Sequence, residues 1–253
     1  MKIKSSIVIA AAAGSAFAPN AQAADLPMKA PAMTAAPAWS WTGLYIGGHL
    51  GAAWQRGRTT GAYTDVVIGP VAFDNKANTT GFIGGGQIGY NWQSGIFVYG
   101  LEADISGLSG SDTASQVVFS ASGFPITMTS SSKIGWLGTV RGRLGATIGG
   151  NTLVYATGGL AYGSVTNTHS ENFPAAGTLA TWEDHSTRTG YAVGGGVEHM
   201  FAPHWTVRAE GLYVDLGKTT LGQPNTGICS NGCQPVVFKN EAIIARAAVN
   251  YKF

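Results

Sequence analysis

Apolar and polar residues alternate along the last segment of the chain, "NEAIIARAAVNYKF", residues 240 to 253. One row of every second residue runs from Ile243 through Val249 to Phe253, and the other contains Ile244, Arg246 and Lys252. Successive side chains of a β-strand point to opposite faces. This period-two pattern therefore predicts a strand with one apolar face and one face that bears charges.

Seven earlier segments have the same strand-like texture. They are residues 43–54, 81–92, 96–108, 133–147, 152–165, 188–201 and 205–217. In 133–147 the alternation predicts Ile134 and Trp136 on the face opposite Lys133, whereas 152–165 is ambiguous because both of its faces are apolar or glycine. The charges of these segments are expected on one common, inward face and to pair with one another there. They are Glu102, Asp104, Arg141, Arg143, Glu198, Arg208, Glu210, Arg246 and Lys252.

Short and long connections alternate between the predicted strands. Tight turns are expected at 93–95, 148–151 and 202–204, and long polar loops at 55–80, 109–132, 166–187 and 218–239. This alternation is typical of an outer-membrane barrel, with short periplasmic turns and long loops outside the cell. The sequence thus predicts an all-β fold, an eight-stranded antiparallel transmembrane β-barrel of up-and-down topology. A soluble sandwich is the alternative.

Composition agrees with a β-rich, lipid-facing chain. It contains 37 glycines and only 11% charged residues, against roughly a quarter in ordinary soluble domains. Beyond the N-terminus no run of about 18 apolar residues predicts a membrane-spanning helix, but a closed barrel can also span lipid. Aromatic residues near the strand ends predict two interfacial girdles, with ordinary core packing as the alternative. They are Trp41, Tyr45, Trp54, Tyr90, Trp92, Trp205, Tyr213, Tyr251 and Phe253.

The N-terminus predicts export. A basic "MKIK", an apolar stretch and "NAQA" indicate a signal peptide over 1–23, cleaved between Ala23 and Ala24. Residues 24–38 are rich in Pro and Ala and predict a flexible periplasmic segment before a barrel domain over 39–253. Without Lys2 and Lys4 the 15 Lys and Arg fall to 13, equal to the 13 Asp and Glu. A neutral chain gives no support for nucleic-acid binding.

Several motifs, in order, carry a family resemblance: "WTGLYIGGHLGAAW", "GFIGGGQIGYNWQ", "FVYGLEADI", "GTVRGRLG", "LVYATGGLAYG", "GYAVGGGVE" and the terminal "NYKF". Over residues 39–253 the chain resembles the small outer-membrane β-barrel proteins abundant in alphaproteobacteria. The resemblance implies an OmpA-like barrel, often a major surface protein and often labelled a porin. It also implies location in the outer membrane, in contact with its lipid and lipopolysaccharide.

Chemistry-bearing motifs are few. Cys229 and Cys233 are predicted to form a disulfide because the chain is exported; a metal pair is the alternative. The G-x-G-x-x-G of Gly84 to Gly89 lies in a predicted strand and is not a dinucleotide site. One predicted loop gathers His169, Glu171, Glu183, Asp184 and His185, which lack metal-ligand spacing, and a solvated acidic loop is expected. Some relatives are associated with haem, so a haem site in this loop is the alternative; no cofactor is expected.

These observations predict a non-enzymatic surface protein with a structural role in the envelope and an interior filled by side chains, since eight strands enclose little more than that. A small porin-like channel or an uptake protein for haem or another small ligand is the alternative. A lipid-modifying enzyme would need a catalytic group that the sequence does not show. Tyr251 and Phe253 resemble the terminal signal read by the barrel-assembly machinery, which is the expected partner during biogenesis. The partner of the external loops is not predicted.

Overall fold

β-Strands make up nearly all of the described chain. The computed structural model describes residues 39–65, 69–110, 112–119, 123–174, 177–221 and 236–253. Within these residues the strands are β1 (Gly43–Asp65), β2 (Gly69–Ser94), β3 (Phe97–Leu108), β4 (Asp112–Phe119), β5 (Pro125–Ile148), β6 (Thr152–Phe173), β7 (Thr178–Ala202), β8 (Trp205–Leu221) and β9 (Val236–Lys252). No helix in this part of the chain is long and apolar enough to cross a membrane.

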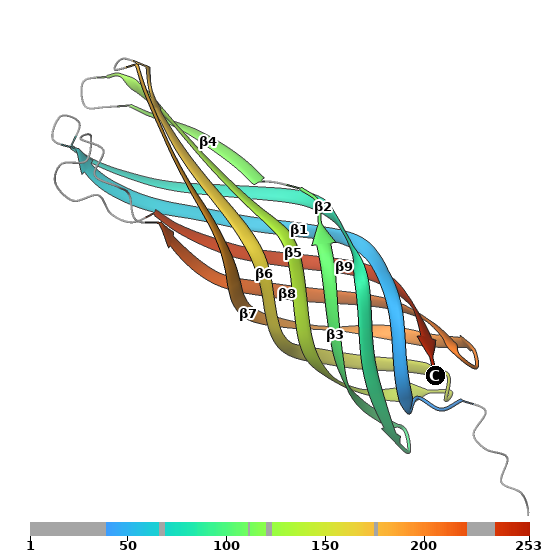
Figure 1. Cartoon of the computed structure of the whole chain (residues 1–253). Coiled ribbons are helices and arrows are strands. Elements are labelled where there is room, and N and C mark those ends of the chain that lie inside the picture. Colours follow the sequence, from blue (N-terminus) through green and yellow to red (C-terminus); the bar gives the residue numbers. More distant parts are fainter. Residues whose placement is uncertain (1–38, 66–68, 111, 120–122, 175–176, 222–235) are drawn as a thin grey trace, which may run out of the picture. The chain divides into compact units, whose positions relative to one another are not determined.

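The antiparallel strands form a closed ring (Figure 1). The last strand, β9, pairs with β1 from Tyr45↔Lys252 onward, which closes the ring as the predicted up-and-down barrel requires. On the other side β3 pairs with β5, so the ring runs β1, β2, β3, β5, β6, β7, β8, β9. β4 pairs with β5 over Asp112↔Ser132 to Phe119↔Pro125, directly beyond the stretch of β5 that pairs with β3.

The polar segments predicted as long loops are mostly strand, so the prediction of long loops is wrong over most of their described length. β1 and β2, for example, stay paired from Gln55↔Thr79 to Asp65↔Gly69, and β6 and β7 stay paired to Phe173↔Thr178. The ladder satisfies the backbone groups whatever the side chains are. Polar residues on both faces give no period-two contrast, so the hydrophobic pattern could not reveal these strands.

The predicted tight turns are confirmed at the opposite end of the ring. β2 and β3 are joined through Gly95, whose φ is +60°, and β5 and β6 through Gly149 and Gly150, at +63° and +81°. Only glycine adopts such backbone angles readily. Pro203 and His204 join β7 to β8.

A β-bulge at Gly135 corrects one predicted face. The ladder passes from Ile134↔Val165 to Trp136↔Ser164, so Gly135 has no partner on β6. Ile134 is buried at 3% exposure and Lys133 is exposed, the reverse of the prediction. The extra residue breaks the alternation, because the parity of a strand changes where a bulge inserts a residue.

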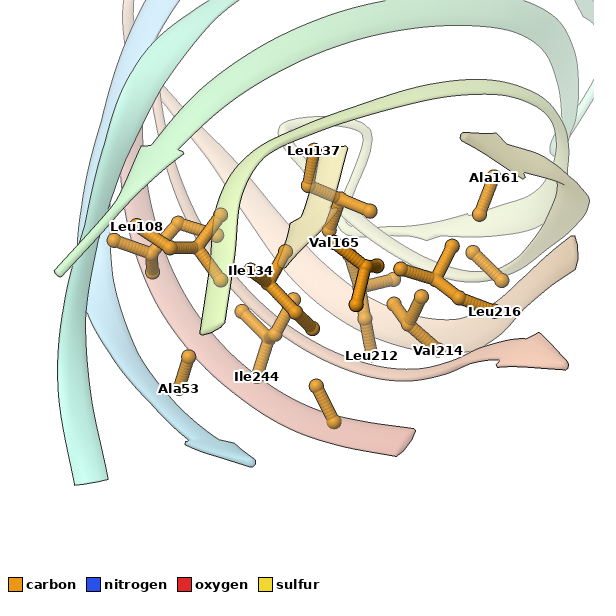
Figure 2. Close-up of a cluster of buried hydrophobic side chains, with 13 residues drawn as sticks. Ala53, Leu108, Ile134, Leu137, Ala161, Val165, Leu212, Val214, Leu216 and Ile244 are labelled. Carbon is orange, nitrogen blue, oxygen red and sulfur yellow. The ribbon is translucent and has the colours of Figure 1, made fainter. Parts of the chain in front are cut away.

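Inside the ring the side chains form layers. A layer of apolar side chains contains at least one residue from every strand of the ring, among them Ala53, Ile83, Leu108, Ile134, Ala161, Ala192, Leu212 and Ile244 (Figure 2). A second apolar group lies near the short turns and consists of Trp41, Val98, Leu153, Tyr155 and Met200. Between the two lies a layer of buried polar and charged residues.

The outward face of the ring carries an apolar belt, defined here as the exposed large apolar residues between Leu44 and Trp54 on β1, between Phe82 and Trp92 on β2, and at the matching levels of the other ring strands. On β3, for example, Phe97, Tyr99, Leu101 and Ile105 are exposed while Glu102 and Asp104 between them are buried. The belt covers about ten residues of each strand, the length that a transmembrane β-strand needs.

Candidate functional site

The interior charge cluster is the candidate functional site. The structure brings together eight of the nine charged residues that the alternation predicted to face inward. They come from five strands: Glu102 and Asp104 (β3), Arg141 and Arg143 (β5), Glu198 (β7), Arg208 and Glu210 (β8), and Arg246 (β9). Each of these side chains is 3% exposed or less. The four carboxylates and four guanidinium groups balance, so the cluster carries no net charge.

Arg141 lies at the centre of the cluster. Its Nη2 is 2.6 Å from Oε1 of Glu102 and 2.9 Å from Oδ2 of Asp104. Its Nη1 is 3.1 Å from Oε1 of Glu210. The hydroxyl of Thr139 donates to the same Oδ2 of Asp104 at 2.6 Å. Three carboxylates from two strands, β3 and β8, thus converge on one guanidinium, whose five donors in a planar fork suit several carboxylates at once.

The other three arginines extend the network around the ring. Arg143 donates to Oε2 of Glu198 at 2.7 Å, and Arg208 donates to Oε2 of Glu102. Arg246 donates through Nε to Oε2 of Glu210 at 2.7 Å. Each carboxylate therefore accepts at least one charge-assisted hydrogen bond, the condition under which buried charges are tolerated.

Two inward tyrosines join the network, and the sequence pattern predicted neither of them there. The hydroxyl of Tyr45 donates to Oε2 of Glu102 at 2.6 Å, and that of Tyr155 donates to Oε1 of Glu210 at 2.8 Å. The guanidinium carbon of Arg143 lies 4.0 Å from the centre of the Tyr155 ring, a cation–π geometry. A Cβ added at Gly89 would lie 2.4 Å from the Tyr45 ring, so glycine provides the space for that ring.

His49 and Ser106 form a further pair that the sequence did not indicate. Nε2 of His49 lies 2.8 Å from Oγ of Ser106, and its Nδ1 lies 3.0 Å from Oε1 of Gln87. A serine beside a histidine is the arrangement that activates a hydroxyl nucleophile. Here His49 and Ser106 are 5% and 2% exposed and lie between the two apolar groups of the interior. The pair contributes to the hydrogen-bond network of the interior.

Lys252 is the one predicted member that lies outside the cluster. Its Nζ donates to the backbone oxygen of Thr42 at 3.1 Å, at the end of the ring that carries the short turns. Lys252 lies two residues beyond the buried Asn250, where the last strand leaves the interior. The inward orientation predicted for Lys252 therefore does not place it in the charge network.

The terminal aromatics lie at the same end. Tyr251 packs against Trp205 and Phe253, with ring centres 5.1 Å apart in each case, and Phe253 is 61% exposed. The backbone N–H of Phe253 donates to the carbonyl of Leu44 at 2.9 Å, which extends the pairing to the last residue.

Two of the predicted girdle aromatics are buried instead. Trp41 lies just before β1 and is 1% exposed, and Tyr45 lies on the inward face of β1 and is 2% exposed. The other seven residues of that prediction are partly or fully exposed on the outward face.

The histidine-containing segment is strand rather than the solvated acidic loop expected. His169 is buried, with Nδ1 3.0 Å from Oγ of Ser130, whereas His185 is exposed and lies 2.9 Å from Glu183. Pairing of β6 with β7 sends His169 and His185 to opposite faces. Within the described part of the chain, no group of three or more His, Cys, Asp or Glu residues could hold a metal ion.

Other predictions lie outside the described residues. These are the signal peptide 1–23 with its cleavage site at Ala23 and Ala24, the segment 24–38, and the disulfide between Cys229 and Cys233.

Comparison with known proteins agrees with a closed antiparallel ring that has an apolar outer belt and a charged interior. Residues 8–234 match the model of a family described as the outer membrane protein beta-barrel domain. The chain belongs to this family. It is a protein of the bacterial outer membrane, as the resemblance implied, and relatives of the same kind cover almost its whole length.

One such relative is the 31 kDa outer-membrane immunogenic protein of Brucella melitensis. It is 36% identical over 97% of this chain and 99% of its own length. The 22 kDa outer membrane protein of Rhizobium leguminosarum is also 36% identical, over 71% of this chain and 66% of its own. Among solved structures, the outer membrane protein OprG from Pseudomonas aeruginosa matches with a TM-score of 0.50 and 14% identity, over 85% of this chain and 98% of that one. This last likeness concerns the fold alone.

Proposed function

We propose that this protein is a non-enzymatic, structural barrel of the outer membrane with eight strand positions and an interior closed by its own side chains. The strand count rests on β5, which pairs first with β4 over Pro125 to Ser132 and then with β3 over Trp136 to Ala146. β3 and β4 are therefore two segments of one strand position. Eight positions enclose a space that side chains fill.

The succession of three interior layers is the observation that supports a closed barrel. An apolar group near the short turns, the charge cluster and the apolar layer of Figure 2 follow one another along the interior. A conducting path would have to pass all three. The catalytic alternative lacks support as well, because the His49–Ser106 pair lies inside this closed region.

We also propose that the short turns face the periplasm and the long paired hairpins lie outside the cell, where they form the exposed surface of the protein. Outer-membrane barrels have this orientation generally, and the immunogenic relatives carry a name that agrees with surface exposure. Protease treatment of intact cells is expected to cleave within the hairpins. Protection of the hairpins until the outer membrane is permeabilised would reject this orientation.

Single-channel recording tests the closed interior. Purified, folded protein is added to a planar lipid bilayer, and a large porin recorded in parallel shows that insertion can be detected. We expect no stable current from this protein because no layer leaves an aqueous path. A reproducible open-channel current from the monomer would overturn the proposal and favour the porin-like alternative.

A further inference from the structure

A row of four cations crosses the outward face of four neighbouring strands beyond the apolar belt. β2, β1, β9 and β8 lie side by side in the ring (Figure 1). The row consists of Lys76 (β2), Arg58 (β1), Lys239 (β9) and Lys218 (β8). Arg58 lies directly opposite Lys76 on one side and Lys239 on the other, and Lys239 lies opposite Lys218. Like charges at opposed positions destabilise a sheet, so pairing of the strands does not account for the row.

Acidic neighbours balance only part of this charge. Arg58 donates to both carboxylate oxygens of Asp74, at 2.9 and 2.7 Å, and Lys239 pairs with Glu241. Lys76 and Lys218, at the two ends of the row, are exposed and make no ion pair with any described residue.

The next row of residues towards the belt does not neutralise the remaining positive charge of the cation row. It contains Asn78, Arg56, Glu241 and Asp215, one on each of the four strands. The two rows together with Asp74 hold five cations and three carboxylates. The surface therefore carries an excess of two positive charges, as large as the formal net charge of +2 of the whole chain.

The row lies at the level of lipid headgroups. On β1 the belt ends at Trp54, which is 41% exposed and belongs to a residue type that favours the membrane interface. Arg58 follows four residues later, about 13 Å along the strand and about 10 Å along the membrane normal for a strand tilted by about 40°. Lysine and arginine side chains can reach back towards the interface over such a distance.

A groove connects the belt to this cationic surface. It has a volume of about 350 Å³ and is lined by Trp54, Ile243 and Thr80, which lie at one level of the sheet, and by Arg56 and Asn78, two residues further from the belt. A groove whose apolar part is followed by a polar part suits a molecule that is itself apolar at one end and charged at the other.

We propose that this surface binds the phosphate-bearing headgroup of lipopolysaccharide in the outer leaflet, with Lys76 and Lys218 as its two unpaired phosphate ligands and the Trp54 groove in contact with the upper part of an acyl chain. The chemistry is that of charge-assisted hydrogen bonds from ammonium and guanidinium groups to phosphate oxygens. The inference rests on the proposed orientation, because only then do the hairpins meet the leaflet that holds this lipid.

Titration of the full-length, folded protein in detergent micelles with bisphosphorylated lipid A, followed by native mass spectrometry, tests the site. The variant Lys76→Gln/Lys218→Gln removes the two unpaired charges while leaving the ion pairs of Arg58 and Lys239 in place. We expect each lysine to contribute about fivefold to affinity, and the double variant to bind about 25-fold more weakly. Both positions are exposed, so folding, read from heat-modifiable gel migration, is expected to be unchanged.

Lys133→Gln is the matched control. Lys133 is an exposed lysine on β5, opposite Thr166, and belongs to no row of cations; its replacement should change affinity less than twofold. Lipid A stripped of both phosphates should bind weakly and equally to all variants. Wild-type affinity in the double variant, an equal loss in the Lys133 variant, or no dependence on the phosphates would each overturn the site.

The outcome is separate from that of the proposed function. Binding in micelles depends neither on conductance nor on orientation in the cell. A protein that conducts current but binds lipid A as described would overturn only the closed interior. Protected hairpins in intact cells would overturn the orientation even if the surface binds phosphate in micelles.

Discussion

Arg141 is the residue on which most of the interior charge depends. Its guanidinium contacts carboxylates from β3 and β8, and its side chain is fully buried. Replacing one partner of a buried ion pair leaves charge without compensation, and this destabilises proteins by about 3–5 kcal/mol. A long apolar side chain in place of this arginine preserves most of the packing, so little stability is lost on that account.

Arg141→Met is therefore expected to lower the free energy of unfolding by about 3–5 kcal/mol, measured by urea titration in detergent. Without Arg141 the cluster holds four carboxylates and three guanidinium groups, and adding Glu210→Gln restores the balance of charge. The second substitution is therefore expected to recover part of the loss, so the two should be strongly non-additive. Lys133→Gln, on the outward surface, should change the unfolding free energy by less than about 0.5 kcal/mol. Strict additivity of the interior pair would show that Arg141 and Glu210 do not interact.

Phe253 has a different role from the interior residues. Its ring is exposed and packs on Tyr251, and its backbone completes the pairing with β1. We propose that the barrel-assembly machinery recognises these terminal aromatics. Deletion of Phe253 is expected to reduce the folded protein in isolated outer membranes several-fold, as seen by immunoblot, while the purified chain still folds in detergent. Phe253→Tyr keeps an aromatic ring and should assemble normally; normal outer-membrane levels of the truncated chain would contradict this role.

Among the elements, β5 shows how a single glycine determines which side chains face inward. Gly135 stands outside the ladder with β6, whereas Gly142 in the same strand pairs regularly with Gly158. Neither glycine would bring an added Cβ within 3.4 Å of another atom. The two therefore differ in their place in the ladder and hardly at all in packing.

Deletion of Gly135 is expected to be tolerated, because Ile134 and Trp136 already occupy successive rungs of the ladder. Deletion of Gly142 shifts one side of β5 by a residue and turns Arg141 or Arg143 towards lipid. We expect heat-modifiable, folded protein from the first variant and none from the second. Equal behaviour of the two deletions would show that Gly135 is not the bulged residue.

The same strand shows what the sequence could and could not predict. Period-two alternation was sufficient to place Arg141 and Arg143 on the inward face, because exposed apolar residues, Val140 and Leu144, occupy the alternate positions on either side of the pair. It failed at Ile134, where a bulge changes parity without any local hydrophobic signal. It also failed beyond the belt, where both faces are polar and strand cannot be distinguished from loop.

The hydrophobic pattern also could not predict which interior side chains contact one another. Tyr45 and Glu102 are 57 residues apart in the chain and meet at 2.6 Å only because β1, β2 and β3 are neighbours in the ring. The register that brings them together depends on turn length and on bulges. Tyr45 could have been placed inward from its parity with His49 on β1, and its position near a strand end favoured an interfacial role instead.

At the scale of the whole molecule, the three interior layers act in series. The barrel stays closed to ions as long as at least one of the three layers excludes water. The apolar layer of Figure 2 includes the cross-strand pair Leu212 and Ile244, and the charge cluster lies on its side towards the short turns. Opening only the apolar layer, or only the charge cluster, is therefore not expected to produce a channel.

Leu212→Ala/Ile244→Ala tests this redundancy. The two truncations are expected to lower the free energy of unfolding by about 2–5 kcal/mol each, measured in detergent, because they leave a cavity in the apolar layer. In planar bilayers the variant should remain as silent as the wild type, since Arg141 and Arg246 with their carboxylates still fill the next layer. Val249→Ala, on the outward apolar face of β9, is the matched truncation and should also be silent. A stable current from the double variant alone would show that the apolar layer, and not the charge cluster, closes the barrel.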